Sequence, residues 1–153
     1  MNQIAALLPA SNIIVDLDVA SKAALFAAIG EVFERSARLP RASVAASLAA
    51  REKLGSTGLG QGIAIPHGRI ARLTDAVGAF ARLATPIAFD APDGKPVDQI
   101  FVLLVPEQAT DRHLQLLSEL AQMFSERAFR DRLATANDAA ALADAFRDWQ
   151  PRG

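Results

Sequence analysis

One of the two histidines in this chain is placed as a reactive group would be. His67 stands between Pro66 and Gly68, directly after the alternating apolar residues 63–65. Proline favours extended backbone in the residue before it, and glycine has no side chain that could cover the imidazole. A neutral imidazole has a nucleophilic nitrogen near neutral pH and can accept a phosphoryl group as a transient phosphoramidate. These residues therefore predict phosphoryl transfer at His67.

Phosphoryl transfer also requires cations and N–H donors around the phosphoryl oxygens. Arg51 is the candidate cation, and the N–H of Gly68 and the neighbouring loop amides are candidate donors. His113 lies near the start of a predicted helix, where the helix dipole favours anions, and is a further candidate donor. His67, His113 and Arg51 each also have a purely structural alternative. His67 could be an ordinary loop histidine, His113 a histidine at the edge of the core that bonds to a backbone group, and Arg51 an arginine that only ends its helix. The residue types alone leave these alternatives open.

The glycine-rich stretch "GLGQGIAIPHGR", residues 58–69, raises the alternative of nucleotide binding. A P-loop needs Gly-Lys-Ser/Thr before a helix, and a dinucleotide fingerprint needs its glycines between a strand and a helix. Neither context is present. We expect instead that the glycines keep the backbone bare around the imidazole.

The composition predicts one soluble globular domain over residues 1–153. With 51% hydrophobic residues, 22% charged residues and a net charge of -1, nothing favours nucleic-acid binding. The absence of cysteine excludes disulfides and thiol chemistry, and two well-separated histidines disfavour a zinc site, so no metal or cofactor is expected. The start lacks a basic signal-peptide region, and no segment has the ~20 apolar residues of a membrane span. We expect a cytoplasmic protein without membrane insertion.

Two helices are predicted ahead of the reactive segment. Apolar residues recur at helical spacing over residues 22–39, with Ser21 as the N-cap. A second helix is predicted over residues 42–54, with Gly55 as its C-terminal signal. This places Arg51 in the last turn of the second helix.

Strands are predicted at residues 63–65, 75–85 and 99–105, with a turn at Asp93 and Gly94. The last strand, "QIFVLLV", is a continuous apolar run of the kind that a central strand buries on both faces. Helices around such strands predict an α/β fold class: a single domain with a mixed β-sheet flanked by helices.

The third major helix is predicted to begin with Thr110 or Asp111 as its cap and to end near Ser125. Its histidine is expected to face inward from the first turn, at the head of an apolar stripe. That stripe consists of His113, Leu117, Leu120 and Phe124.

The C-terminal part predicts a short helical piece followed by a helix capped by Asn137 or Asp138. Its apolar face is formed by Leu142, Phe146 and Trp149.

The stretch "REKLGSTGLGQGIAIPHGR", residues 51–69, closely resembles the active-site signature of a known family. The family is that of the fructose/mannitol-type enzyme IIA domains of the bacterial phosphoenolpyruvate:sugar phosphotransferase system, including its nitrogen-regulatory branch. The segment "HLQLLSELAQMF" from His113 resembles the second, less specific signature of that family. The matching positions of the first signature are Glu52, Leu59, Gly60, Ile63, Ala64, Ile65, Pro66, His67 and Gly68.

The resemblance implies a role for each candidate residue. His67 matches the histidine that accepts phosphate, His113 the second active-site histidine, and Arg51 the arginine beside the phosphoryl group. The implied relay runs from phosphoenolpyruvate to enzyme I, to an HPr-like carrier of the nitrogen branch, and then to His67. In that family the phosphate is carried on Nε2.

Within the family, the opening segment and the lack of a fused IIB or IIC part resemble the nitrogen-regulatory branch. Its output is the phosphorylation-dependent binding of regulatory target proteins. Two alternatives remain: a free-standing sugar-transport IIA subunit that passes phosphate to a IIB protein, and a IIA-like module that binds partners without turning over phosphate. The presence of both histidines and Arg51 argues against the second alternative.

Overall fold

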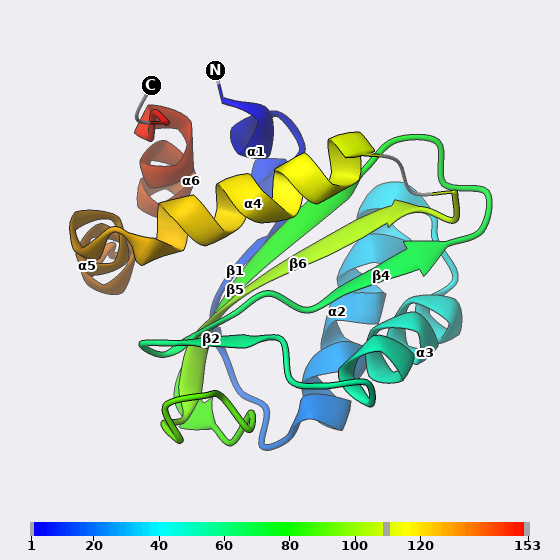
Figure 1. The fold of residues 1–153 in the computed structure, drawn as a ribbon, viewed down its shortest axis with the longest axis horizontal. Helices are drawn as coiled ribbons and strands as arrows, with labels where there is room; N and C mark the ends of the chain where they lie inside the picture. The colour runs from blue at the N-terminus through cyan, green and yellow to red at the C-terminus, as the bar shows by residue number, and fades with distance from the viewer. Residues whose placement is uncertain (1, 109–110, 152–153) are drawn as a thin grey trace.

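A mixed β-sheet crosses the molecule between α4 (Asp111–Ser125) and the helix pair α2 (Lys22–Ala37) and α3 (Arg41–Glu52) (Figure 1), and a layer of buried hydrophobic side chains packs against each of its faces. The structure is a computed structural model that describes residues 2–108 and 111–151. Within these residues six strands form one sheet: β1 (Ile13–Leu17), β2 (Gly58–Gly60), β3 (Ile63–Ala64), β4 (His67–Ile70), β5 (Val77–Ile87) and β6 (Val97–Pro106).

Strand β6 is the centre of the sheet. It pairs antiparallel with β5 on one side and parallel with β3 and then β4 on the other, while β1 and β2 lie at the edges. Its side chains alternate between the two hydrophobic layers, with Phe101 and Leu103 in one and Val102 and Leu104 in the other. The prediction of a central strand at residues 99–105 is therefore confirmed.

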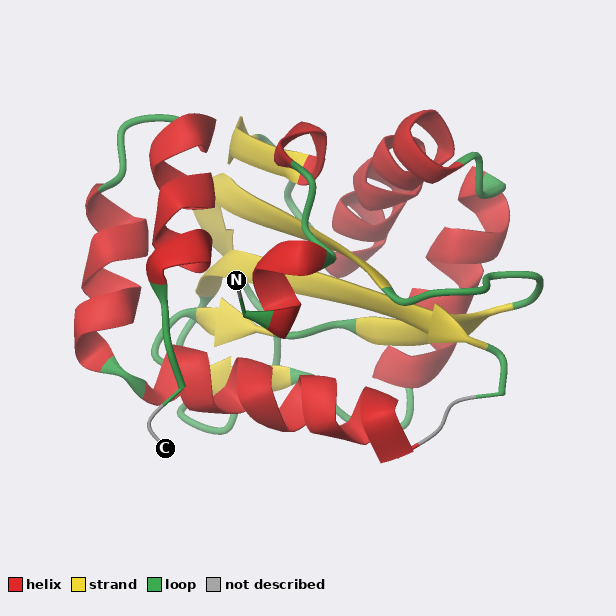
Figure 2. Ribbon diagram, turned by 90° about the horizontal axis from the view of Figure 1, so that it is seen from above, coloured by secondary structure: helices red, strands yellow, loops and turns green. Residues whose placement is uncertain are grey.

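Helices cover both faces of the sheet (Figure 2). One layer holds α2 (Lys22–Ala37) and α3 (Arg41–Glu52), which pack against each other. The other layer is formed by α1 (Gln3–Ala6), α4 (Asp111–Ser125), α5 (Arg127–Thr135) and α6 (Ala139–Asp148). The predicted α/β fold class, with a mixed sheet flanked by helices, is confirmed.

Local signals set the start of two helices as expected. The Ser21 side chain accepts a hydrogen bond from the N–H of Ala24, and the Asp138 side chain accepts one from the N–H of Ala141. Helix α2 ends two residues before the predicted boundary, because Arg38 adopts a left-handed conformation with φ 58°.

Helix α4 buries a slightly different row of side chains from the predicted one. The buried row consists of Leu116, Leu120, Met123 and Phe124, and Leu117 is only partly buried. His113 remains in line with this row and is partly buried. Asp111 is the first residue of the helix rather than its cap, and the alternative cap Thr110 lies outside the described residues.

Within the described residues, five elements were not predicted: α1, the short 3-10 helix η1 (Ala10–Asn12), β1, β2 and β4. Strand β4 matters most, because the sequence indicated a loop around His67. The N–H of Leu103 donates to the carbonyl of Pro66 at 3.0 Å, so β6 pairs with the segment on both sides of the proline. Proline lacks an N–H but keeps its carbonyl, and that carbonyl suffices to continue the parallel ladder here.

The two ends of the described chain meet beside α6. The Asn2 side-chain amide donates to the backbone carbonyls of Phe146 at 2.7 Å and Trp149 at 2.8 Å. Its side-chain oxygen caps α1 by accepting from the N–H of Ala5 at 2.7 Å. One asparagine thus fixes α1 against the C-terminal helix.

Candidate active site

A cleft of about 590 Å³ brings the four predicted site residues together. Helix α3 contributes Arg51, strand β4 contributes His67 and Gly68, and the first turn of α4 contributes His113. The floor is apolar and is formed by the buried Leu103 and Val105 of the central strand. Residues from three separate segments of the chain therefore share one mostly apolar cavity.

The two ring nitrogens of His67 have different partners. Nδ1 lies 3.0 Å from the carbonyl oxygen of Ile65, and Nε2 lies 3.2 Å from Nε of Arg51. A carbonyl oxygen can only accept, so Nδ1 carries the proton and Nε2 carries the lone pair. The Arg51 N–H donates to that lone pair, which agrees with this tautomer. The nitrogen that faces the cation is thus the nucleophilic one.

His67 is partly buried in strand β4, which corrects the expectation that the glycines leave the imidazole uncovered, and which also excludes the alternative of a loop histidine. Burial lowers the pKa of the imidazole below its usual value of 6.5, and the charge of Arg51 lowers it further. The hydrogen bond to Ile65 and the charge of Glu52 act in the opposite direction. Because the first effect is the largest, the ring is neutral at neutral pH.

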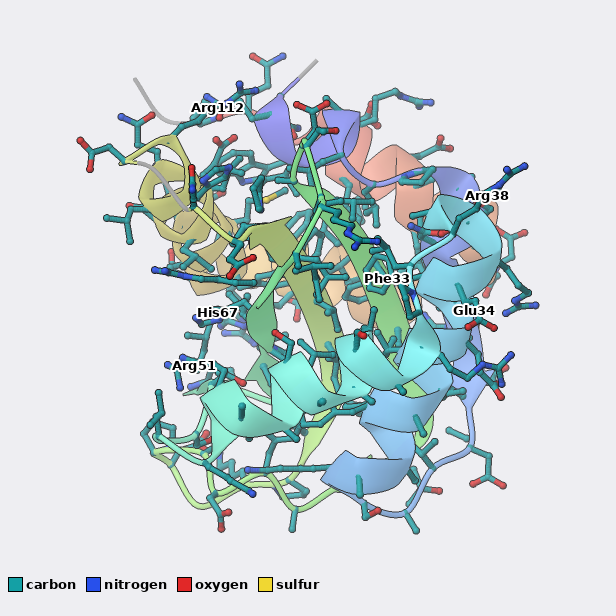
Figure 3. All side chains as sticks on the ribbon, turned by 90° about the vertical axis from the view of Figure 1, so that its right-hand side faces the viewer. Phe33, Glu34, Arg38, Arg51, His67 and Arg112 are labelled. Atoms are coloured by element: carbon teal, nitrogen blue, oxygen red, sulfur yellow. The ribbon has the colours of Figure 1, made fainter. Side chains whose placement is uncertain are left out.

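Arg51 lies in the last turn of α3, as predicted, and its guanidinium is held at two points. Nε donates to His67, and Nη1 donates to the carbonyl of Gly55 at 2.9 Å. Figure 3 shows Arg51 next to His67, on the opposite side of the view from Glu34 and Arg38. One guanidinium nitrogen, Nη2, has no part in these two hydrogen bonds and can reach toward an anion in the cleft.

His113 reaches the cleft from the first turn of α4, together with Asp111. It also borders a second cleft, of about 520 Å³, on the other side of the helix, where Asp75 and Arg112 are exposed. The N-terminal N–H groups of α4 point toward the end of the helix that carries this histidine.

The lack of a side chain at Gly68 matters for a different physical reason from the predicted one. It is buried in β4 opposite Leu104, and the space beside its Cα is filled by helix α3. A Cβ at this position would collide with the Oγ of Ser47, whose hydroxyl donates to the carbonyl of Arg69 at 2.9 Å. The glycine therefore permits the close approach of α3 to β4 and does not leave one side of the histidine open.

The upstream glycines also serve a different purpose from the predicted one. Gly60 and Gly62 adopt φ values of 93° and 80° at the turn between β2 and β3, and Gly58 packs against Ala91. They shape a tight hairpin rather than a bare surface around the imidazole, and none of the three lines the cleft.

Two exposed leucines at the rim of the cleft were not among the predicted site residues. Leu54 is 84% exposed and Leu114 is 66% exposed, and both line the cleft that contains His67. The sequence feature that could have identified Leu54 and Leu114 is that each lies close in sequence to a predicted site residue but outside the apolar face of its predicted helix. Large exposed apolar side chains around a polar site are typical of protein-binding surfaces.

Within residues 2–108 and 111–151, no three His, Cys, Asp or Glu side chains come together in a way that could hold a metal ion. In the same residues, no helix has the length and apolar character that crossing a membrane requires.

Comparison with known proteins gives a consistent result. Residues 6–149 match the family described as phosphoenolpyruvate-dependent sugar phosphotransferase system, EIIA 2. A nitrogen regulatory protein of Pseudomonas aeruginosa is 54% identical over 96 residues, which span 63% of this chain and 62% of that relative. A nitrogen regulatory protein of Escherichia coli strain K12 is 47% identical over 109 residues, spanning 71% of this chain and 67% of that relative. The match thus covers somewhat less than two thirds of the Pseudomonas protein.

Among solved structures, the crystal structure of nitrogen regulatory protein IIA-Ntr from Neisseria meningitidis is similar over nearly its whole length. Its TM-score is 0.88 at 51% sequence identity, covering 94% of this chain and 99% of that chain.

Proposed function

Because this chain belongs to the EIIA type 2 family of the phosphoenolpyruvate-dependent sugar phosphotransferase system, we propose that it is a phosphohistidine carrier with a regulatory output. His67 accepts a phosphoryl group on Nε2 from an HPr-like phosphocarrier of the nitrogen branch. The observation that carries this proposal is the fixed tautomer of His67, with Nδ1 against the Ile65 carbonyl and Nε2 facing Arg51.

The chemistry follows from that arrangement. The Nε2 lone pair forms a bond to phosphorus while the phosphorus–nitrogen bond of the donor breaks, and its electron pair returns to the donor imidazole. The attacking ring gains positive charge, which the Nδ1–H bond to Ile65 stabilises. Arg51 exchanges its contact with Nε2 for contacts with the phosphoryl oxygens.

His113 completes the site as a hydrogen-bond donor to the phosphoryl oxygens from the first turn of α4. The N-terminal end of that helix favours negative charge. We assign neither His113 nor Arg51 as a phosphate acceptor: each stabilises the group that His67 carries. Gly68 lines the cleft and contributes its N–H as a donor to the phosphoryl oxygens, and its lack of a side chain lets α3 approach β4 so that Arg51 reaches His67.

The regulatory output is favoured over sugar transport by the similarity to nitrogen regulatory proteins along most of the chain. Phosphorylation adds roughly two negative charges to a cleft with an apolar floor and two exposed leucines at its rim. A partner with an apolar centre that docks there binds the unphosphorylated state better, since the added charge is desolvated poorly in such an interface.

The test is a reconstituted relay. Purified wild-type protein and the His67→Ala and His113→Ala variants are incubated with phosphoenolpyruvate, enzyme I and an HPr-type carrier. We expect an acid-labile, base-stable adduct in wild type, the same adduct formed more slowly in His113→Ala, and none in His67→Ala. Phosphate at the wild-type level in His67→Ala would overturn the assignment.

A second arm separates regulation from transport. A fructose- or mannitol-type IIB protein is added to the phosphorylated chain, and partners are captured from a cytoplasmic extract with wild type, His67→Ala and the charge mimic His67→Glu. Retention of phosphate together with state-dependent partners supports regulation. Rapid discharge to IIB, with the same partners for all three proteins, supports sugar transport instead.

A further inference from the structure

A buried carboxylate lies next to Arg51 in the sequence, and the phosphoryl-transfer chemistry does not use it. The Glu52 side chain is only 6% exposed, and both of its oxygens are occupied. Oε2 accepts from Nζ of Lys22 at 2.9 Å and from the N–H of Thr57 at 3.1 Å, and Oε1 accepts from the Thr57 hydroxyl at 2.6 Å. We refer to Lys22, Glu52 and Thr57 as the Glu52 cluster.

A buried ion pair contributes little net stability, because the loss of hydration offsets most of the attraction between the charges. We infer that the Glu52 cluster instead fixes the positions of nearby backbone and side chains. Glu52 holds Thr57 through both its backbone N–H and its hydroxyl, and this defines the path of residues 53–57 between α3 and β2. Lys22 ties the same carboxylate to the first turn of α2 and places its ammonium 4.6 Å from the centre of the Phe89 ring.

Both halves of the reactive pair are connected to Thr57. The Thr57 carbonyl accepts from the N–H of Ile65 at 3.0 Å, and the Ile65 carbonyl in turn is the partner of His67 Nδ1. On the other side, the segment that Thr57 closes presents the Gly55 carbonyl to Nη1 of Arg51 at 2.9 Å. Thr57 is thus linked to His67 through two hydrogen bonds by way of Ile65, and to Arg51 through the backbone of residues 55–57 and one hydrogen bond at Gly55.

We propose that Glu52 is a positioning residue, which acts through Thr57 to hold the Arg51 guanidinium and the His67 imidazole in register for phosphoryl transfer. This inference rests on the proposed function of His67. Lys22 holds the Glu52 carboxylate in its orientation, and the position of Thr57 in turn sets the positions of the Gly55 and Ile65 carbonyls.

The helix pair provides its own matched control. Helices α2 and α3 are also bridged at their other end, where Nη2 of Arg41 lies 2.7 Å from Oε1 of Glu34. That pair joins the same two helices, but it is considerably exposed, and Figure 3 shows Glu34 on the far side from Arg51 and His67. The Glu34→Gln variant therefore weakens the contact between the helices without touching the Glu52 cluster.

The first measurement is phosphoryl transfer from an HPr-type carrier to Thr57→Val, Thr57→Ser, Glu52→Gln and Glu34→Gln. Valine keeps the shape of threonine but removes the hydroxyl, so we expect kcat to fall about threefold to tenfold, the size typical of one lost hydrogen bond, with KM unchanged. Thr57→Ser restores the hydroxyl and most of the rate. Glu52→Gln loses at least as much as Thr57→Val, and Glu34→Gln transfers at the wild-type rate.

Combining Thr57→Val with Arg51→Ala shows whether the effect of Thr57 on the transfer rate depends on Arg51. In the Arg51→Ala background, Thr57→Val should slow transfer by less than in wild type, because one of the two side chains that it positions is gone. The same fold loss in both backgrounds would mean that the cluster acts independently of Arg51, and would overturn the inference that it positions the guanidinium.

The second measurement does not depend on phosphate. In a ¹H–¹⁵N spectrum of the folded protein, the Arg51 Nε–H signal reports its hydrogen bond to His67. We expect this signal to move toward the shift of a free arginine in Thr57→Val and Glu52→Gln, and to stay in place in Glu34→Gln. An unchanged signal and an unchanged rate in Thr57→Val would sink the positioning role. If wild type accepts no phosphate at all, the proposed function fails, while this signal still tests the geometry.

Discussion

At the scale of single residues, the site depends on which ring nitrogen of His67 carries the proton and which one faces a positive charge. The Ile65 carbonyl fixes the proton on Nδ1, and Arg51 faces the free Nε2. The charge of Arg51 lowers the pKa of His67, and in the proposed reaction it attracts the phosphoryl oxygens after transfer. We therefore expect one cation to favour both the nucleophilic form of the ring and the product of the proposed reaction.

The lowered pKa of His67 predicts the pH dependence of phosphate acceptance. Since burial favours the neutral ring, the rate should stay constant as the pH falls from neutral through 6.5, and should decrease only below that value. The measurement is the initial rate of phosphorylation against pH, with the donor carrier kept fully phosphorylated. A midpoint at or above 6.5 would contradict the burial argument.

The same shift predicts a slope in stability. Between the lowered pKa and the usual value of 6.5, the unfolded chain binds more protons at position 67 than the folded chain. The free energy of unfolding contributed by His67 is thus complete above 6.5 and is lost as the pH falls below it. Urea titrations of wild type and His67→Gln over this range should show the slope in wild type and a smaller one in the variant.

Substitution of Arg51 should slow phosphoryl transfer without moving the phosphate to another residue. Arg51→Ala removes a charge-assisted contact of about 1.5–3 kcal/mol, so the rate should fall roughly tenfold to hundredfold. Arg51→Lys should recover only part of this loss, since an ammonium cannot form the paired contacts of a guanidinium. Rates within about twofold of wild type for Arg51→Ala would exclude the assigned role.

At the scale of secondary-structure elements, the site depends on how closely α3 packs against β4. Arg51 belongs to the helix and His67 to the strand, so their contact requires the two elements to approach within the space that Gly68 leaves. Ser47 occupies that space and bonds to the Arg69 carbonyl, one residue further along β4. The packing of two elements therefore decides whether the reactive pair forms.

Gly68→Ala should test this packing. The added methyl group meets Ser47 and the α3 backbone, so we expect a loss of about 1–3 kcal/mol in the free energy of unfolding and a slower transfer. The second substitution Ser47→Ala, which removes the colliding hydroxyl, should recover part of both losses. A control substitution of another glycine, Gly94→Ala, would add backbone strain of its own, because Gly94 has a φ of 71°. The recovery on adding Ser47→Ala is therefore the measurement that tests the packing.

At the scale of the whole molecule, the proposed function requires a partner protein to dock over the cleft. Its floor comes from the central strand, its walls from helices on both faces of the sheet, and its rim carries two exposed leucines, Leu54 and Leu114. The proposed transfer requires a carrier to bring its own phosphohistidine to Nε2 of His67, so we expect these leucines to lie where the two surfaces meet.

Leu54→Ser and Leu114→Ser should therefore raise the KM for the phosphocarrier, by about fivefold or more, with little change in kcat or in stability. Leu59→Ser is the control, since Leu59 is 45% exposed but lies outside the cleft. Transfer kinetics at varied carrier concentration measure the effect. Equal KM values in all three variants would place the docking surface elsewhere.

The sequence by itself determined the features that depend on interactions between residues close together in the chain. Ser21 and Asp138 cap their helices, and Arg51 lies in the last turn of α3, because capping and helical periodicity act within a few residues. The long apolar run of β6 was recognisable as a central strand for the same reason. The residue types around His67 were likewise sufficient to predict which residues gather near it in the cleft, while its role as phosphate acceptor stays a prediction.

The tertiary structure alone decided the features that join distant segments. Strand β4 exists because β6 offers a ladder to the carbonyl of Pro66, which no local pattern encodes. The reason for Gly68 lies in Ser47, and the partner of Glu52 is Lys22 on another helix. Pairing of this kind is defined only when the chain has brought remote backbone and side chains together, since their contacts depend on packing and not on local conformational preference.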